Sequence, residues 1–511
     1  MLALAVPFGL AAQVRPSGAP LDPIANFPIP VVTPPLLPRL FEPAVPVGFF
    51  HTLGIAAGLA DDITLSRGSV RTRLSHDGGE FRRPFDPDGV SQRGAEAAGW
   101  RRLSDRGGVW GRAAVEDAIF GNAGFATFMD PYGSSPLVIA DTTAPRVRRA
   151  RALMEGAMGW RVGGFRLGLA GGLDVREDAT RDARFIRSVR HAVPAVQVSL
   201  GHRLPAGLTL VLHGRWTGGS ETATFRPEPG ASRAYQFDGF DEPFPRDVVP
   251  PNTYFRRNQR DAYAAGLGVT GGLLGGRWVL GWARTYRSDE HFTLLIDSPP
   301  VDTWKADGWV ARAAYQRQVR GVLSTLTLHA DRLTGDVTRA DIEGVITRER
   351  ETRMGALLEL RWASPAPRWE VGGTVGLDRT RRQVSDFLVR VDSDLDVWHP
   401  GGGLAVARTF SSTTVALAGG VAWSGAYATL PNPPGMGPIY RQYIAPALSR
   451  DATRTSTVAA SLSGRHRVTE LLAFQGSATW NQTKVRGAPA PLGPRGRYGQ
   501  WEIEAAVVVG R

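Results

Sequence analysis

The sequence predicts an all-β protein: a transmembrane antiparallel β-barrel of about 18 strands, within a range of 16 to 18. Three observations predict this fold class. Hydrophobic residues recur with a period of two, connections alternate between short and long, and nothing beyond the N-terminus approaches the ~18 uncharged residues that a spanning helix requires. The 511 residues have a mean hydropathy of −0.16, as expected where lumen-facing polar residues alternate with lipid-facing apolar ones.

The clearest hairpin lies between residues 353 and 378. Alternate residues over 354–362 are apolar, and alternate residues over 369–377 are apolar again after a Ser-Pro-Ala-Pro-Arg turn. Trp362 and Trp369 both stand at the turn end of the apolar face. Aromatic residues at the end of an apolar row of lipid-spanning length are typical of a membrane interface. We therefore interpret these two tryptophans as part of an aromatic girdle on the periplasmic side.

The N-terminus predicts two segments outside the barrel. Residues 1–12 are apolar and end Leu-Ala-Ala before Gln13, which is typical of a signal peptide; because the basic region is missing, we expect its true start to lie upstream. An apolar N-terminal strand is the alternative. Residues 13–65 are rich in proline, including the run from Pro28 to Pro46, which favours extended conformations. They form a periplasmic tail or a plug in the lumen, and the sequence leaves both open.

The barrel is predicted to occupy residues 66–511, with eight hairpins and a single last strand. The predicted strands are 92–104 with 109–117, 149–162 with 164–176, 193–204 with 207–217, 260–273 with 277–287, 306–318 with 321–331, 351–363 with 368–379, 399–409 with 412–425, 453–466 with 471–483, and 497–509. A further strand over 66–74 makes the count even, as a barrel with both ends in the periplasm requires.

Short turns within hairpins and long links between them give the barrel an orientation. The turn over 105–108 has a few residues, whereas the link over 218–256 is long, and this order is kept along the chain. We therefore expect short periplasmic turns and long extracellular loops. A soluble β-sandwich or propeller is the alternative, and it offers no reason for the regular order.

The last strand is amphipathic in the same way. Trp501, Ile503, Ala505, Val507 and Val509 share one face, and two glutamates lie on the other. Such a strand resembles the C-terminal signal by which outer-membrane proteins are assembled, which predicts the barrel-assembly machinery as a partner. The chain departs from that signal by ending Val-Gly-Arg instead of an aromatic residue.

Three motifs in the first third of the chain carry a family resemblance. FRRPFDPDG begins at Phe81, GAEAAGWRRLSDRGGVWGRAAVED ends at Asp117, and DPYGSSPLVIADTT begins at Asp130. With the hairpin array, they resemble a family of large, uncharacterised bacterial outer-membrane barrels known only as a domain of unknown function. The resemblance covers most of the mature chain and implies architecture and location in the bacterial outer membrane. It implies no catalytic residue, because the family supplies none.

Motifs for catalysis and cofactors are weak. The chain has no cysteine, which excludes disulfides, thiolate metal sites and cysteine nucleophiles. Gly266–Gly271 matches the dinucleotide fingerprint, but it lies within a predicted strand, whereas the fingerprint works between a strand and a helix. Asp289–His291 are consecutive and do not converge on a metal, and His202, His213 and His329 belong to no motif. We therefore expect no enzyme, no cofactor and no metal site.

The charge pattern is more informative. The net charge is +12, and arginines cluster where predicted long loops meet strands. The candidate rim residues are Arg148, Arg149, Arg151, Arg184, Arg187, Arg256, Arg257, Arg381 and Arg382. One interpretation is a solvated rim with Asp and Glu partners. The sharper hypothesis is that the rim binds outer-leaflet phosphates or steers anionic solutes, because guanidinium pairs bidentately with phosphate and carboxylate.

The leading functional hypothesis is porin-like passage, passive or gated, of small solutes, among which the basic rim would favour anions. The alternative is a non-enzymatic surface or scaffold barrel whose long loops bind a ligand or partner while the lumen stays plugged. Expected partners are outer-membrane lipid and lipopolysaccharide, the barrel-assembly machinery and small solutes. No nucleic-acid-binding motif is present, so we expect no nucleic acid. The solute, the oligomeric state and the openness of the lumen are not set by the sequence.

Overall fold

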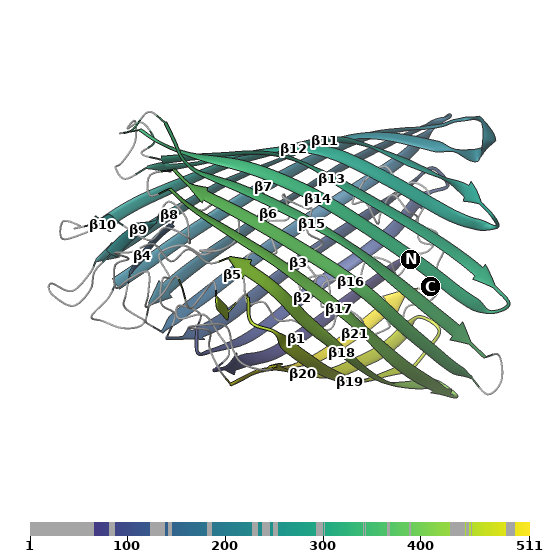
Figure 1. Cartoon of the computed structure of the whole chain (residues 1–511). Coiled ribbons are helices and arrows are strands. Elements are labelled where there is room, and N and C mark those ends of the chain that lie inside the picture. The colour runs from purple at the N-terminus through teal and green to yellow at the C-terminus, as the bar shows by residue number, and fades with distance from the viewer. Residues whose placement is uncertain are drawn as a thin grey trace.

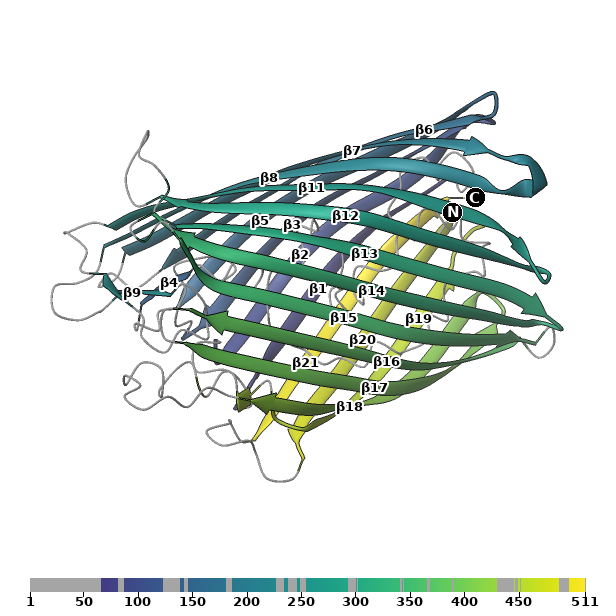
Figure 2. The same ribbon diagram turned by 45° about the horizontal axis from the view of Figure 1, so that its top comes forward.

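The protein forms a closed barrel of 18 antiparallel strands (Figures 1 and 2). The computed structural model describes residues 66–80, 87–122, 138–141, 146–180, 186–226, 234–237, 246–248, 254–292, 300, 302–340, 342, 344–364, 368–387, 390–429, 445, 449–450, 452–486 and 496–510. Each barrel strand pairs with its neighbours in chain order, and the predicted fold class is therefore confirmed, including its strand number. The predicted signal peptide at 1–12 and the proline-rich segment at 13–65 lie outside the described residues.

The barrel strands are long, and they tilt strongly against the barrel axis (Figure 1). Their bounds are β1 Arg67–Gly79, β2 Gly89–Ser104, β3 Gly107–Gly121, β5 Val147–Val162, β6 Phe165–Thr180, β7 Ile186–Arg203, β8 Thr209–Arg226, β11 Tyr254–Leu273, β12 Gly276–Phe292, β13 Asp302–Val319, β14 Val322–Arg339, β15 Gly344–Ala363, β16 Trp369–Asp386, β17 Val391–Phe410, β18 Thr413–Thr429, β19 Thr455–Arg467, β20 Leu472–Val485 and β21 Arg497–Gly510. All eight predicted hairpins, the added first strand and the single last strand are present.

The first and last strands close the barrel. β1 pairs antiparallel with β21, and Val70 faces Val507 while Leu74 faces Ile503 across the seam. The apolar side chains of both strands therefore continue the outer surface without a break. Closure leaves no free sheet edge, as lipid requires, because an unpaired backbone group in hydrocarbon costs several kcal/mol.

The short turns gather at one end of the barrel, and the strand ends that the long connections join lie at the other (Figure 1). Two of the turns consist of a pair of residues with positive φ: Leu274 and Gly275 at 52° and 73°, and Arg320 and Gly321 at 49° and 82°. Two successive positive φ values define the turn whose twist matches that of antiparallel strands. The second residue of each pair is glycine, which adopts this conformation without steric strain.

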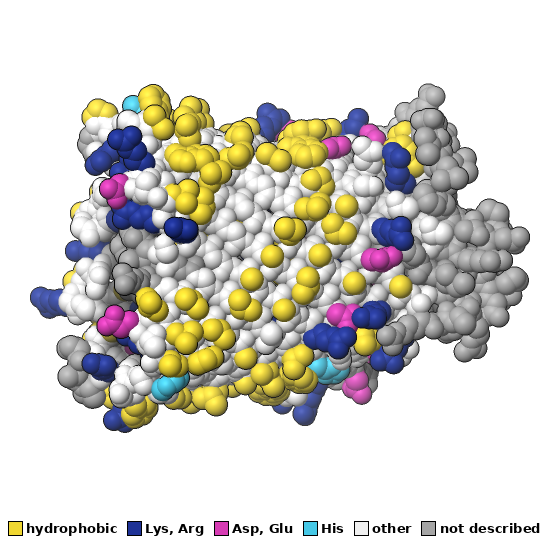
Figure 3. Space-filling view, turned by 180° about the vertical axis from the view of Figure 1, so that it is seen from behind, with side chains coloured by type: hydrophobic (Ala, Val, Ile, Leu, Met, Phe, Trp, Pro, Cys, Tyr) yellow, Lys and Arg dark blue, Asp and Glu magenta, His cyan; other side chains and the backbone are white. Residues whose placement is uncertain are grey.

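The outward face carries an apolar belt. Leu326, Leu358 and Val375 lie side by side on β14, β15 and β16, and 38%, 40% and 66% of their surfaces are exposed. Figure 3 shows hydrophobic side chains across the middle of the barrel wall, with charged side chains toward both ends. A closed antiparallel barrel with such a belt is the architecture of bacterial outer-membrane proteins. The chain is therefore an outer-membrane β-barrel, as the sequence predicted.

The inward face is small and polar. On β16 the inward positions are Glu370, Gly372, Thr374, Gly376 and Asp378, alternating with the outward row that ends at Leu377. Among the described residues, buried apolar side chains form only small inward clusters, such as Val90 with Ala118, Phe120 and Val147. The polar interior follows from the two-residue period of the strands.

Most strands extend further on the extracellular side than the sequence predicted. The segment predicted as 368–379 spans Trp369–Asp386, and the one predicted as 399–409 spans Val391–Phe410. Beyond the belt the outward residues are charged, so the hydrophobic period disappears while backbone pairing continues. Arg381 of β16 and Asp394 of β17 form a diagonal ion pair there, with Nη2 and Oδ2 2.5 Å apart.

Two extracellular connections contribute a second, small sheet. It contains β4 Val138–Asp141, β9 Ala234–Phe237 and β10 Arg246–Val248, with β9 in the centre. β4 belongs to the connection between β3 and β5, and the other two strands belong to the connection between β8 and β11. Across the described residues, no helix is long and apolar enough to cross a membrane.

Candidate solute pathway and charged surfaces

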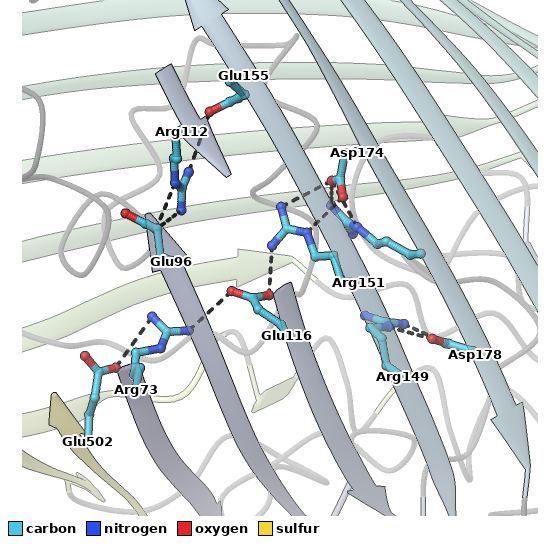
Figure 4. A network of polar contacts seen from close by, with 11 residues as sticks. Arg73, Glu96, Arg112, Glu116, Arg149, Arg151, Glu155, Asp174, Asp178 and Glu502 are labelled. Carbon is cyan, nitrogen blue, oxygen red and sulfur yellow. Dashed lines mark hydrogen bonds and ion pairs between the residues drawn. The ribbon is translucent and has the colours of Figure 1, made fainter. Parts of the chain in front are cut away.

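The inner wall carries a set of ion pairs that spans the barrel seam, which we call the ion-pair ladder; Figure 4 shows part of it. Its side chains come from six neighbouring strands, β21, β1, β2, β3, β5 and β6. They are Arg71, Arg73, Arg112, Arg149, Arg151, Arg176, Glu96, Glu116, Glu155, Asp174, Asp178, Glu502 and Glu504. The two-residue strand period places all of them opposite the lipid-facing row.

One chain of contacts runs from β21 to β6. Arg73 lies 3.8 Å from Glu502 and 3.9 Å from Glu116. Arg151 donates to Glu116 at 3.0 Å and to Asp174 at 2.9 Å. These contacts link the two ends of the barrel sheet through side chains as well as through the backbone.

A second chain lies beside it. Glu96 accepts hydrogen bonds from Arg71 at 2.9 Å and from Arg112 at 2.8 Å. Arg71 also lies 3.8 Å from Glu504, and Arg112 lies 3.6 Å from Glu155. Each arginine therefore contacts carboxylates on both sides, so the charges alternate along the wall.

The most buried carboxylate of the ladder is Asp174, whose side chain is 0% exposed. It accepts from Arg151 and also from Arg176, whose Nη2 lies 2.6 Å from Oδ2. Next to it, Arg149 donates through two nitrogens to Asp178, at 2.6 and 2.7 Å. Bidentate charge-assisted bonds of this kind fix side-chain geometry, and they offset the cost of removing the charges from water.

The inner wall of β17 to β20 differs from the ladder because most of its side chains are small and uncharged. Ser424 lies 2.7 Å from Thr455, and Thr457 lies 2.8 Å from Thr483, oxygen to oxygen. Asn481 donates to Gln500 at 3.0 Å. A solute in the lumen would therefore meet hydroxyl and amide groups on the wall formed by β17 to β20 and alternating charges on the wall formed by β21 to β6.

Three of the predicted rim arginines point into the barrel. Arg149 and Arg151 belong to the ladder, and Arg382 donates to Glu349 on the neighbouring strand at 2.6 Å. These residues lie on the inward face of their strands and are separated from the lipid surface by the barrel wall.

Three others point outward. Arg148 donates to Asp117 at 2.6 Å, Arg381 pairs with Asp394, and the Arg257 guanidinium lies 4.8 Å from the centre of the Phe292 ring. Arg184 lies outside the described residues, and the side chains of Arg187 and Arg256 are not described. The described arginines are thus divided between two surfaces and do not form a single ring.

The two predicted girdle tryptophans point outward at the periplasmic end. Trp362 is 42% exposed, and Trp369 is half-buried. The Arg408 guanidinium lies 5.0 Å from the centre of the Trp369 ring and 4.6 Å from that of Phe410. Arginine over an aromatic ring is a favourable arrangement at a membrane interface.

Sequence reasoning placed Glu502 and Glu504 on the polar face of their strand but did not identify the carboxylates of the ladder as site residues. Glu116 and Asp174 were not singled out, although each lies on the polar row of its strand, and neither was Arg73. The sequence did contain one usable signal, whether a residue number is odd or even. An ionisable residue that alternates with the apolar row of its strand lies on the polar row and faces inward. The parity of the residue number also places Arg148 on the opposite face of its strand from Arg149 and Arg151, although the three residues are close together in the sequence.

The weak catalytic and cofactor motifs form no functional site among the described residues. Gly266–Gly271 lies inside β11, as expected from its predicted strand. Asp289 and His291 face inward, whereas Glu290 between them lies on the opposite face. Within the part of the chain that the structure describes, no three metal-ligating side chains are arranged around a common point.

Residues 56–505 match the model of a family of unknown function, DUF6850. The chain belongs to this family. The match confirms the resemblance carried by the motifs between Phe81 and Asp130, and it covers nearly all of the barrel. No curated protein matches the chain.

Solved outer-membrane proteins share limited similarity with the chain. The ferric preacinetobactin receptor BauA from Acinetobacter baumannii has a TM-score of 0.40 at 8% identity, with 86% of this chain and 80% of the other covered. The transporter YddB from Escherichia coli has a TM-score of 0.39 at 7% identity, covering 87% and 81%. The copper transporter OprC has a TM-score of 0.38 at 10% identity, covering 86% and 80%. Similarity at this level carries no inference about ligand or activity.

Proposed function

We propose that this barrel provides passive passage for small polar solutes across the outer membrane. The observation that supports the proposal is the polar inner wall, with the ion-pair ladder on β21 to β6 and hydroxyl groups on β18 to β20. An antiparallel barrel of this strand number encloses a lumen wide enough for water.

The balance of charge on the ladder favours weak discrimination between small cations and anions. It contains six arginines and seven carboxylates, and each arginine contacts at least one carboxylate. Paired charges produce a smaller potential at the channel axis than unpaired ones. The anion preference suggested by the net charge would therefore have to arise from residues other than this wall.

Planar-bilayer conductance and liposome swelling test the proposal. Purified full-length protein is expected to conduct ions and to admit a neutral monosaccharide into liposomes. A variant lacking residues 13–65 tests the proline-rich segment: swelling that rises after the deletion would identify that segment as a lumen plug. If neither protein conducts or admits sugar, passage is not the function.

The second candidate is a surface protein whose extracellular connections bind a ligand or partner. The small sheet favours it, because Ile139 pairs with Gln236 and Tyr235 pairs with Asp247, joining two connections that are far apart in sequence. An ordered element on the outer side would give such a surface a fixed shape. A closed lumen in both conductance experiments would favour this candidate.

A further inference from the structure

A group of charged side chains lies on the outer surface directly above the apolar belt. Taken from the belt toward the extracellular end, the outward-facing residues of β2 are Ala97, Ala95 and Arg93. Those of β3 are Ala113, Val115 and Asp117. The outward rows of β5, β6 and β7 also change from apolar residues to a charged residue toward the extracellular end of the strand. Five adjacent strands thus change from apolar to charged at the extracellular edge of the belt, and their charged residues are Arg93, Asp117, Arg148, Glu177 and Arg190.

Three of these residues form a clamp. Asp117 accepts from Arg93, whose Nη2 lies 2.8 Å and Nε 3.0 Å from Oδ2. Its other oxygen, Oδ1, accepts from Arg148 Nε at 2.6 Å. The carboxylate therefore holds one guanidinium on each side, and the triad has a net charge of one positive unit.

The arginines of the clamp remain accessible. The Arg93 side chain is 70% exposed, and that of Arg148 is 45% exposed. Among the described residues, the Nη1 of Arg93 and both Nη groups of Arg148 have no acceptor. These N–H groups are available to an anion that approaches from the lipid side.

A neighbouring pair extends the charged surface. Arg190 on β7 donates to Glu177 on β6 at 3.3 Å, and its side chain is 76% exposed. The strand register places Asp117 opposite Ala150, and Ala150 opposite Glu177. The small alanine side chain thus separates the clamp from the pair and leaves the space between them uncrowded.

We propose that Arg93 and Arg148 bind a phosphate group of an outer-leaflet glycolipid, with Arg190 beside them contacting the same lipid or its neighbour. The position above the belt matches the height at which outer-leaflet headgroups lie, and guanidinium is suited to phosphate because it donates two parallel hydrogen bonds. This inference does not depend on solute passage, because the clamp is on the opposite side of the barrel wall from the lumen.

The experiment measures lipid binding to full-length protein in detergent micelles by native mass spectrometry. The probes are lipid A with two phosphates, lipid A with one phosphate, and phosphatidylcholine. Arg93→Ala/Arg148→Ala is expected to weaken binding of the doubly phosphorylated lipid by about tenfold, because two charge-assisted contacts are lost. Arg101→Ala is the matched control, since Arg101 is exposed on the same face of the same strand at the periplasmic end.

A second variant keeps the test decisive if the double variant fails to assemble. Asp117→Asn removes the internal competitor for both guanidinium groups while conserving size, and it is expected to bind the doubly phosphorylated lipid at least as tightly as the unmodified protein. Inorganic phosphate is not expected to displace the lipid, because it makes no contact with the belt. The proposal would be overturned if Arg93→Ala/Arg148→Ala and Arg101→Ala weakened lipid binding equally. It would also be overturned if the affinity did not depend on the number of phosphates on the lipid.

Discussion

His329 on β14 contacts Asp378 on β16 across the intervening strand, with Nε2 3.2 Å from Oδ1. The residue between them on β15 is Gly355, which pairs with His329 on one side and with Asp378 on the other. An added Cβ at Gly355 would lie 2.1 Å from Asp378 Oδ1 and 2.4 Å from His329 Cε1. The glycine is thus what allows two inward side chains, two strands apart, to meet.

Gly355→Ala should therefore separate His329 from Asp378. Because both are ends of flexible side chains, the wall can adjust, and we expect a loss of about 1 kcal/mol or less, as for a partly exposed ion pair. The free energy of unfolding in urea, followed by tryptophan fluorescence, measures it. Gly476→Ala is the control, since its new Cβ would meet nothing closer than 3.7 Å. Equal effects of the two substitutions would show that the contact adds nothing to stability.

Adjacent leucines on β15 test the assignment of the two faces. Leu358 faces lipid within the belt, whereas Leu357 faces the lumen. Leu358→Arg should destabilise the barrel by roughly 2 to 4 kcal/mol, because a charged group at mid-membrane depth must leave water. Leu357→Arg should be tolerated better, since a polar interior can hydrate the new side chain. Heat-modifiable gel mobility reports assembly of both variants, and a tolerated Leu358→Arg would mean that the faces are reversed.

The fold could be predicted from the sequence because its main determinant is local. The face of a residue follows from the parity of its position, so the outward rows of hairpin 353–378 and of the last strand could be identified without knowing their neighbours. The structure confirms both: Trp362 and Trp501 face outward, and Glu502 and Glu504 face inward. The extracellular ends of the strands were harder to predict from the sequence, because the hydrophobic period stops where the charged outer surface begins.

The ion-pair ladder could not be predicted in the same way, since it depends on register between strands. Glu116 and Arg151 are 35 residues apart in sequence, and the length and path of an extracellular connection decide that they meet. A shift of two residues in that register would keep every side chain on its face yet replace every partner. Parity alone could have divided the arginine cluster at 148–151 between the two surfaces, but it could not have named Asp117 and Asp174 as partners.

Asp117 and Asp174 provide a matched pair of aspartates, each held by two arginines. Asp174 lies inside the barrel at 0% exposure, and Asp117 lies outside at 19%. Asp174→Asn should cost roughly 3 to 5 kcal/mol, because Arg151 and Arg176 would then be buried without their shared counter-charge. Asp117→Asn should cost about 1 kcal/mol or less, as for exposed ion pairs. Urea unfolding compares them, and a similar cost for both would mean that water reaches Asp174 freely.

Ion selectivity tests whether solutes pass along the ladder. Arg151 is an inward residue of β5, and Arg151→Gln removes one positive charge while leaving Glu116 with Arg73 and Asp174 with Arg176. If ions pass along this wall, the cation-to-anion permeability ratio should rise about twofold, because the local potential becomes more negative. Arg332→Gln is the control: it removes the same charge from an exposed, outward position on β14 and should leave the ratio unchanged. The reversal potential of single channels in a salt gradient gives the ratio for each protein. An unchanged ratio in Arg151→Gln, in a channel that still conducts, would remove the ladder from the solute path.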